Sequence, residues 1–205
     1  MEQRSKEWYS ERLGKFTASE ISKLLGVKGL GLTGESYCFE KACEIVFGVD
    51  EEESFVSMDM QRGINLEPLA FNKFSELKQL EFIETKNAYF FPLGDYAGAS
   101  PDGIVGNDAV LEIKCPRSTK FFKLVAKGEI AIDSEYYDQM QMQMLCSNST
   151  HAYFFNYIIF KGVEMWHEIE VKRDEKRIEL IKERLEQAVR VRDEFVQYLL
   201  NNKQF

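Results

Sequence analysis

The fold of this 205-residue chain is decided by two short stretches, Ser100-Pro101-Asp102-Gly103 and Leu111-Glu112-Ile113-Lys114-Cys115-Pro116. Side chains alternate between the two faces of a strand, so Glu112 and Lys114 point the same way while Ile113 points into the core. Asp102 begins the preceding hairpin and is expected to lie beside them. The sequence therefore predicts two carboxylates and one ammonium group at a single spot.

This group of side chains suits a particular chemistry. Two neighbouring carboxylates repel each other unless a cation lies between them, and hard oxygen ligands favour Mg²⁺, with Mn²⁺ as a substitute. Such a site polarises a phosphoryl oxygen and generates hydroxide from bound water. Lys114 is expected to orient or deprotonate that water, or to stabilise negative charge in the transition state. The simpler alternative is a structural salt bridge from Lys114 to Glu112 or Asp102.

The same stretches resemble a known family. Asp102 with Glu112-x-Lys114 resembles the core signature of the PD-(D/E)xK nuclease superfamily, and the full stretches resemble the phage lambda exonuclease and YqaJ-type viral recombinase family. Further segments fit this family in the same order along the chain: Trp8-x-x-x-Arg12-x-Gly14-x-x-Thr17-Ala18-Ser19, Arg62-Gly63-x-x-x-Glu67-x-x-Ala70 and Tyr136-Tyr137-x-Gln139-x-Gln141. The resemblance covers residues 8–145.

The resemblance implies roles for the acidic residues. Asp102 and Glu112 would be metal ligands, with the Ile113 backbone carbonyl as a further ligand, and Lys114 would act on the attacking water. Glu67 would add a carboxylate from an upstream helix and complete or support a two-metal site.

The resemblance also implies a pocket for the terminal 5′-phosphate, made by Arg12 and Ser19. Thr17 with Glu20 three residues later has the form of a capping box, which predicts a helix over residues 18–25 with Ser19 in its first turn. The free N–H groups and dipole of a helix N-terminus favour an anion, and Arg12 can add a bidentate contact. Ser100 would place a second hydroxyl near the scissile phosphate.

Two glutamines of the Tyr136 segment remain as candidates for the site. Gln139 and Gln141 are two residues apart on a predicted helix, so they cannot share one face. Gln139 is the favoured catalytic residue, and Gln141 remains a candidate for DNA binding. The alternating methionines Met140, Met142 and Met144 are expected to pack in the core.

The resemblance implies a Mg²⁺-dependent 5′→3′ exonuclease that acts on double-stranded DNA ends and leaves 3′ single-stranded tails for phage-type homologous recombination. It further implies a homo-oligomer in the form of a ring trimer, a single-strand annealing protein as partner, and a cytoplasmic location as a phage or prophage protein in a bacterial host. One alternative is another PD-(D/E)xK nuclease, either a restriction-type endonuclease or a flap- or structure-specific enzyme. The other is a catalytically inactive DNA-end-binding protein.

Composition limits these options. The chain has 26 Lys and Arg against 34 Asp and Glu, a net charge of −8, which excludes a generally basic nucleic-acid binder. DNA contact is therefore expected from local cations, namely Arg62, Arg117, Lys120 and Lys123. Only two histidines are present, so a metal site built on several histidines is not expected.

The cysteines and the apolar stretches fit a cytoplasmic protein without membrane spans. No C-x-x-C pair occurs among the four cysteines, which are Cys38, Cys43, Cys115 and Cys146. Neither a zinc ribbon nor a closely spaced iron–sulfur motif is therefore expected, and the cysteines are expected to be reduced, mostly buried thiols. The polar start predicts no signal peptide. The longest apolar stretch, Ala152–Phe160, is about half of the ~20 residues that a membrane-spanning helix needs.

The chain is predicted to be one α/β (α+β) domain over residues 1–205, with a restriction-endonuclease-like core in which helices flank a central mixed sheet. It would have a helical part (1–80), a catalytic sheet core (81–171) and a long C-terminal helix (173–203). Helices are expected over residues 4–13, 18–25, 35–47, 57–80 (kinked or divided near Pro68), 118–127, 134–148 and 173–200. Strands are expected over residues 82–91, 96–100, 103–105, 110–114, 152–160 and 163–171, and the last two are expected to form a hairpin that turns at Lys161-Gly162. A mobile glycine-rich loop is expected over 28–34, and a solvated acidic loop at 50–53.

Overall fold

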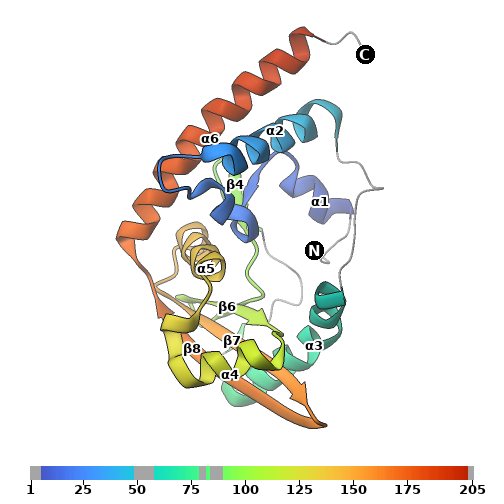
Figure 1. Cartoon of the computed structure of the whole chain (residues 1–205), viewed down its shortest axis with the longest axis vertical. Coiled ribbons are helices and arrows are strands. Elements are labelled where there is room, and N and C mark those ends of the chain that lie inside the picture. The colour runs from blue at the N-terminus through green and yellow to red at the C-terminus, as the bar shows by residue number, and fades with distance from the viewer. Residues whose placement is uncertain (1–5, 49–57, 79–81, 84–89, 203–205) are drawn as a thin grey trace.

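The computed structural model describes residues 6–48, 58–78, 82–83 and 90–202 (Figure 1). Its elements run in the order α1 (Lys6–Arg12), β1 (Phe16–Thr17), the 3₁₀ helix η1 (Ala18–Leu24), α2 (Gly31–Phe47), α3 (Met58–Lys78), β2 (Phe82–Ile83), β3 (Phe91–Leu93), β4 (Ala97–Ala99), β5 (Gly103–Val105), β6 (Ala109–Lys114), α4 (Ser118–Lys127), the 3₁₀ helix η3 (Gly128–Ala131), α5 (Ser134–Ser147), β7 (His151–Phe160), β8 (Val163–Lys172) and α6 (Glu175–Asn201).

The larger sheet has the strand order β2-β5-β6-β7-β8. β6 and β7 are parallel, and every other neighbouring pair in this sheet is antiparallel. β7 and β8 form the predicted hairpin, which turns at Lys161 and Gly162 with φ of 50° and 80°. Two consecutive residues with positive φ match the right-handed twist of the flanking strands. The expected mixed sheet is therefore confirmed.

Helices cover both faces of this sheet. Leu111 and Ile113 of β6 pack with α3 side chains in one core cluster, while Val110 packs with residues of α4 and α5 in another. Because side chains alternate along a strand, Glu112 and Lys114 share the face of Val110. The strand itself thus places both functional groups on the side covered by α4 and α5.

Helix α5 lies in the interior, between the sheet and the layer formed by α2 and α6 (Figure 1). All of its residues from 138 to 144 are buried. Met140 and Met144 join the cluster against the sheet, and Met142 joins the cluster formed with η1 and α6. The prediction that these methionines pack in the core is confirmed, and the intervening polar side chains are buried with them.

A smaller sheet connects the N-terminal part to the core. Its order is β1-β4-β3, with β1 parallel and β3 antiparallel to β4. Ser100 directly follows β4, and Pro101 then leads to Asp102, so this sheet sets the distance between the N-terminal residues and the acidic ones.

The segment at residues 18–25 differs from its prediction. It forms a 3₁₀ helix of seven residues, and the side chain of its N-cap residue, Thr17, makes no capping bond. The Thr17 hydroxyl instead lies 3.2 Å from the Ser19 hydroxyl, and Glu20 binds Lys23 at 2.8 Å. The capping box is therefore not formed, because both of its side chains bond to other partners.

The glycine-rich loop is shorter than predicted, since α2 already begins at Gly31. Gly34 is buried inside this helix, and a Cβ atom there would lie 3.2 Å from the Lys23 carbonyl oxygen. Glycine at this position permits the close approach of α2 to η1, which explains why a residue typical of loops occurs within a helix.

Two other predictions are changed by the tertiary structure. The expected strand over 82–91 is two short strands in different sheets, β2 and β3, and residues 84–89 lie outside the described part of the chain. Of the two alternatives expected near Pro68, a division of the helix is excluded, because α3 continues through this residue, and the kink stays a prediction. The acidic run at 50–53 also lies outside the described residues.

The fold class is confirmed as mixed α/β, with helices around a mixed sheet and a long C-terminal helix. No helix in the described ranges combines the length and the apolar character needed to cross a membrane.

Candidate active site

Glu112 is the most deeply buried acidic residue of the site, with 1% of its surface exposed. Its Oε1 accepts hydrogen bonds from the Lys114 ammonium and from Gln139 Nε2, the latter at 2.8 Å. Its Oε2 accepts a hydrogen bond from Gln143 Nε2 at 2.6 Å. A carboxylate from β6 is thus held by a cation of its own strand and by two amides of α5.

Asp102 is held in place by the backbone of β6. Its N–H donates to the Leu111 carbonyl at 2.9 Å, and its Oδ2 accepts from the Ile113 N–H at 2.7 Å. The pairing of β5 with β6 ends at Gly103 and Leu111, so beyond that point the Asp102 side chain takes the place of a strand partner. The role of the Ile113 carbonyl as a metal ligand stays a prediction.

The surroundings of the Asp102 carboxyl group disfavour its ionised form. Burial, together with the nearby charges of Glu112 and Glu67, raises the pKa of Asp102 well above its usual value. A hard divalent cation would relieve this repulsion, because it favours the ionised forms of all three acids. The residues present therefore fit such an ion chemically, although no three His, Cys, Asp or Glu side chains in the described ranges are grouped closely enough to hold one as they stand.

The Lys114 ammonium is kept in its charged form. Burial alone lowers the pKa of Lys114, but the carboxylates of Glu112 and Asp102 outweigh this effect and raise it above the usual lysine value. The ion pair with Glu112 is the structural salt bridge that the sequence left open as an alternative. Its burial beside a third charged group distinguishes it from an ordinary pair on an exposed strand.

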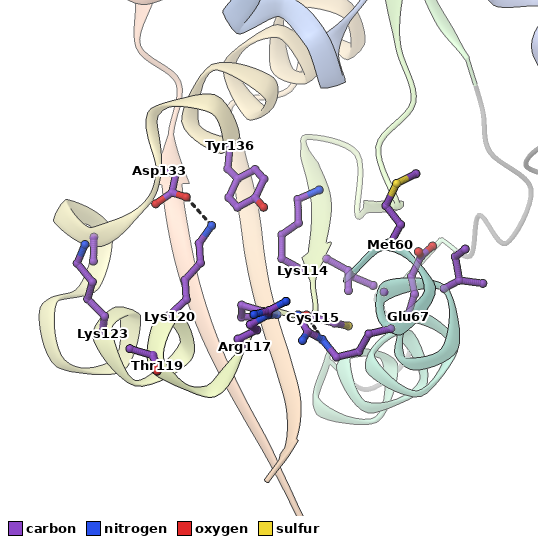
Figure 2. Close-up of a pocket in the computed structure, with 16 residues that line it drawn as sticks. Met60, Glu67, Lys114, Cys115, Arg117, Thr119, Lys120, Lys123, Asp133 and Tyr136 are labelled. Atoms are coloured by element: carbon purple, nitrogen blue, oxygen red, sulfur yellow. Dashed lines mark hydrogen bonds and ion pairs between the residues drawn. The ribbon is translucent and has the colours of Figure 1, made fainter. Parts of the chain in front are cut away.

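Lys114 lines a cavity of about 770 Å³. Figure 2 shows α3 with Met60 and Glu67 on one side, α4 with Lys120 and Lys123 on the other, and Lys114 pointing into the space between them. The four cations expected to contact DNA all line this cavity: Arg62, Arg117, Lys120 and Lys123. A chain with net charge −8 thus concentrates positive charge beside its buried acids.

Arg12 lies close to two aromatic rings. Its Cζ is 3.5 Å from the centroid of the Trp8 ring and 4.9 Å from that of Phe90. Its Nη1 donates to the Trp8 carbonyl at 2.7 Å, and its Nη2 donates to the Ser100 hydroxyl. Burial lowers the pKa of Arg12 to about 10, which leaves it charged at neutral pH.

Two pairs of residues predicted for the phosphate pocket are in contact, Arg12 with Ser100 and Thr17 with Ser19. Arg12 contacts Ser100, and Ser100 is two residues from Asp102. Thr17 of β1 pairs with Gly98 of β4, the strand that leads to Ser100, and the Ser19 hydroxyl at the start of η1 lies 3.2 Å from the Thr17 hydroxyl. Because η1 is a 3₁₀ helix without a side-chain cap, the predicted capped α-helix N-terminus is not formed, and the phosphate pocket itself stays a prediction.

Gln139 and Gln141 differ as their spacing predicts. Gln139 faces Glu112, whereas Gln141 donates to the Lys172 carbonyl at 2.9 Å and accepts from the Asp174 N–H at 2.8 Å. Gln141 thus joins α5 to the β8–α6 connection, away from the site, and this corrects its placement among the DNA-binding candidates. The sequence interpretation missed Gln143, although its spacing of four residues from Gln139 places both on one helix face.

Comparison with known proteins agrees with this geometry. Residues 7–150 match the YqaJ-like viral recombinase domain, and the chain belongs to this family. No curated protein is detectably similar to the chain in sequence.

Among solved structures, the chain is similar to the alkaline exonuclease LHK-Exo from Laribacter hongkongensis, with 28% identity, a TM-score of 0.81, and coverage of 96% of this chain and 97% of that one. LHK-Exo in complex with dAMP matches with 27% identity, a TM-score of 0.81, and coverage of 95% and 96%. A phage-related exonuclease from Haemophilus somnus 129PT shares the fold, with 18% identity, a TM-score of 0.72, and coverage of 90% and 96%. Family and fold together support a phage-type exonuclease.

Proposed function

We propose that this chain is a Mg²⁺-dependent exonuclease that degrades the 5′-terminated strand of double-stranded DNA in the 5′→3′ direction and leaves 3′ single-stranded tails. One observation carries the proposal: the Glu112–Lys114 pair lies beside Asp102, which is two residues from the contact between Ser100 and Arg12. A group suited to phosphodiester hydrolysis and a cation suited to a terminal phosphate are thus joined by one short segment.

Asp102, Glu112 and Glu67 are the residues that would hold the metal. Bound Mg²⁺ would polarise the scissile phosphate and lower the pKa of the attacking water. Lys114 is held protonated by its carboxylate neighbours. Of the three roles open to it, stabilisation of the negative charge that grows on the phosphate is therefore favoured over deprotonation of water.

Arg12 and Ser100 would set the register of the cleaved strand. The Arg12 guanidinium carries several N–H donors in one plane, and its Cζ lies 3.5 Å from the centroid of the Trp8 ring. A 5′-phosphate seated there would place the next phosphodiester near Asp102. LHK-Exo was solved with dAMP, a deoxynucleoside monophosphate, which is the class of product that stepwise cleavage releases.

The decisive experiment is digestion of linear duplexes with defined end chemistry, in Mg²⁺, Ca²⁺ or EDTA. We expect release of mononucleotides from 5′-phosphorylated ends in Mg²⁺ and none in EDTA. A label at the 3′ end should remain on long single strands, whereas a label at the 5′ end should be released first. Release from 3′ ends would contradict the proposed polarity.

Two controls separate this function from its alternatives. Covalently closed circular duplex should remain intact, because it has no end, and its cleavage would indicate an endonuclease instead. Asp102→Asn should lower the rate by at least about 10²–10⁴-fold while the protein stays folded. A wild-type protein that bound ends but released no nucleotides would be an end-binding protein.

The assembly implied by the family resemblance belongs to the same proposal. A ring trimer would have three times the chain mass of 23.9 kDa, which light scattering measures directly. A recombination role further requires a single-strand annealing protein, and co-purification with the annealing protein of the same replicon tests that requirement.

A further inference from the structure

Gln141 and Gln143 of α5 are both fully buried, yet their hydrogen bonding differs. Gln141 uses both ends of its amide, which bond to Lys172 and Asp174. Gln143 donates to Glu112 Oε2 at 2.6 Å, and its own Oε1 has no hydrogen-bond partner within the described residues. Gln141 therefore joins α5 to the connection between β8 and α6, whereas the Gln143 side chain hydrogen-bonds to the Glu112 carboxylate of the site.

Stability of the fold does not explain a glutamine at position 143. A buried amide oxygen without a partner is unfavourable, and a side chain without polar atoms would avoid that penalty. Met140 and Met144 on the same helix pack against the sheet in this apolar way. The bond to Glu112 is thus what distinguishes glutamine from methionine here.

The two oxygens of Glu112 differ in their remaining capacity to accept bonds. Oε1 already accepts from Lys114 and Gln139, while Oε2 accepts from Gln143 alone. A carboxylate oxygen offers about two lone-pair positions, so within the described part of the chain Oε2 is the oxygen with one still open. Gln143 holds this oxygen, and Gln139, one helical turn earlier, holds the other.

We propose that Gln143 is a positioning residue that orients the Glu112 carboxylate for binding a divalent cation. The inference rests on the proposed metal-dependent nuclease function and deepens it. Groups that hydrogen-bond to metal-ligating side chains fix the orientation of those ligands, and their loss typically costs about 10–100-fold in metal affinity or activity.

The test measures Mn²⁺ binding to the DNA-free protein by the electron paramagnetic resonance signal of free Mn²⁺, so that binding is read without turnover. Gln143→Met is the test variant, and Gln141→Met is the matched control on the same helix with the same burial. We expect Gln143→Met to weaken Mn²⁺ binding by about 10–100-fold, and to raise the Mg²⁺ concentration for half-maximal DNA degradation in the same direction. Gln141→Met should lower the melting temperature but leave Mn²⁺ affinity at the wild-type value.

Mn²⁺ affinity unchanged in Gln143→Met, or reduced equally in both variants, would overturn the role of Gln143. Circular dichroism checks folding, and Gln143→Leu replaces the methionine variant if that variant does not fold. A different result would refute the proposed nuclease function itself. If the wild-type protein neither binds Mn²⁺ nor releases nucleotides, both that function and the role of Gln143 are refuted.

Discussion

The guanidinium of Arg12 stacks on the ring of Trp8, with 3.5 Å between its Cζ and the ring centroid. This contact fixes the plane of the guanidinium, while the hydrogen bond to Ser100 fixes its direction. A cation fixed in both respects can recognise the geometry of a phosphate as well as its charge.

Arg12→Lys should therefore abolish much of the preference for 5′-phosphorylated over 5′-hydroxyl ends, even though the charge is kept. Lysine lacks the planar fork that stacks and binds bidentately. The measurement is the ratio of initial rates on two duplexes that differ only at the 5′ end. Arg190→Lys, on an exposed position of α6, should leave this ratio unchanged. An unaltered ratio in Arg12→Lys would remove Arg12 from phosphate recognition.

Gly98→Ala should weaken the same pocket indirectly. A Cβ atom at Gly98 would lie 2.2 Å from the Phe90 ring, so the ring would have to leave its place beside Arg12. Overpacking of this kind typically costs about 1–3 kcal/mol of unfolding free energy, which urea denaturation measures. The 5′-phosphate preference should fall together with the stability. A stable variant with full preference would show that Phe90 does not support Arg12.

Lys120→Ala and Lys123→Ala should differ in their effect on salt dependence. Lys120 is paired with Asp133, whereas Lys123 makes no ion pair within the described residues (Figure 2). The logarithm of DNA affinity falls linearly with the logarithm of salt concentration, and each phosphate contact that is lost should make this slope shallower by about 1. We expect this decrease in Lys123→Ala and a smaller one in Lys120→Ala, measured by DNA binding in Ca²⁺ from low to high salt. Lys182→Ala on the outer side of α6 is the control, and a decrease there would indicate a nonspecific effect.

The buried thiols should make stability depend on alkaline pH. Burial raises the pKa of Cys38 to about 11 and that of Cys146 to about 12, from an ordinary value of 9.0. Above pH 9 the unfolded chain loses these protons while the folded chain keeps them, so the folded state binds more protons and its stability falls as pH rises. Urea denaturation between pH 8 and pH 10.5 measures this slope.

Cys146→Ala is the matched variant for this effect, since it removes one of the four cysteines whose thiol pKa is raised by burial. Its slope should be shallower than that of the wild type over the same pH range. An identical slope in the variant would mean that ionisation of this thiol does not contribute.

The sequence alone determined the local pattern of the site. Because side chains alternate between the faces of a strand, the sequence of β6 places Glu112 and Lys114 on one face. The two residues Lys161-Gly162 between two strand-forming segments predicted the hairpin. Those inferences depend on backbone periodicity and on turn chemistry, which act over a few residues. The order of the four segments likewise sufficed for the family, because each segment is a local arrangement of residue types.

Tertiary structure alone decided which distant groups meet. The hydrogen bond from Gln143 to Glu112 depends on how α5 lies across the sheet. The place of the Phe90 ring beside Arg12 depends on its close approach to Gly98 of β4. Gly34, a residue typical of loops, lies inside α2 because only a glycine fits where this helix approaches η1. Contacts between segments far apart in the chain depend on the packing of whole elements, and no pattern confined to one segment contains that information.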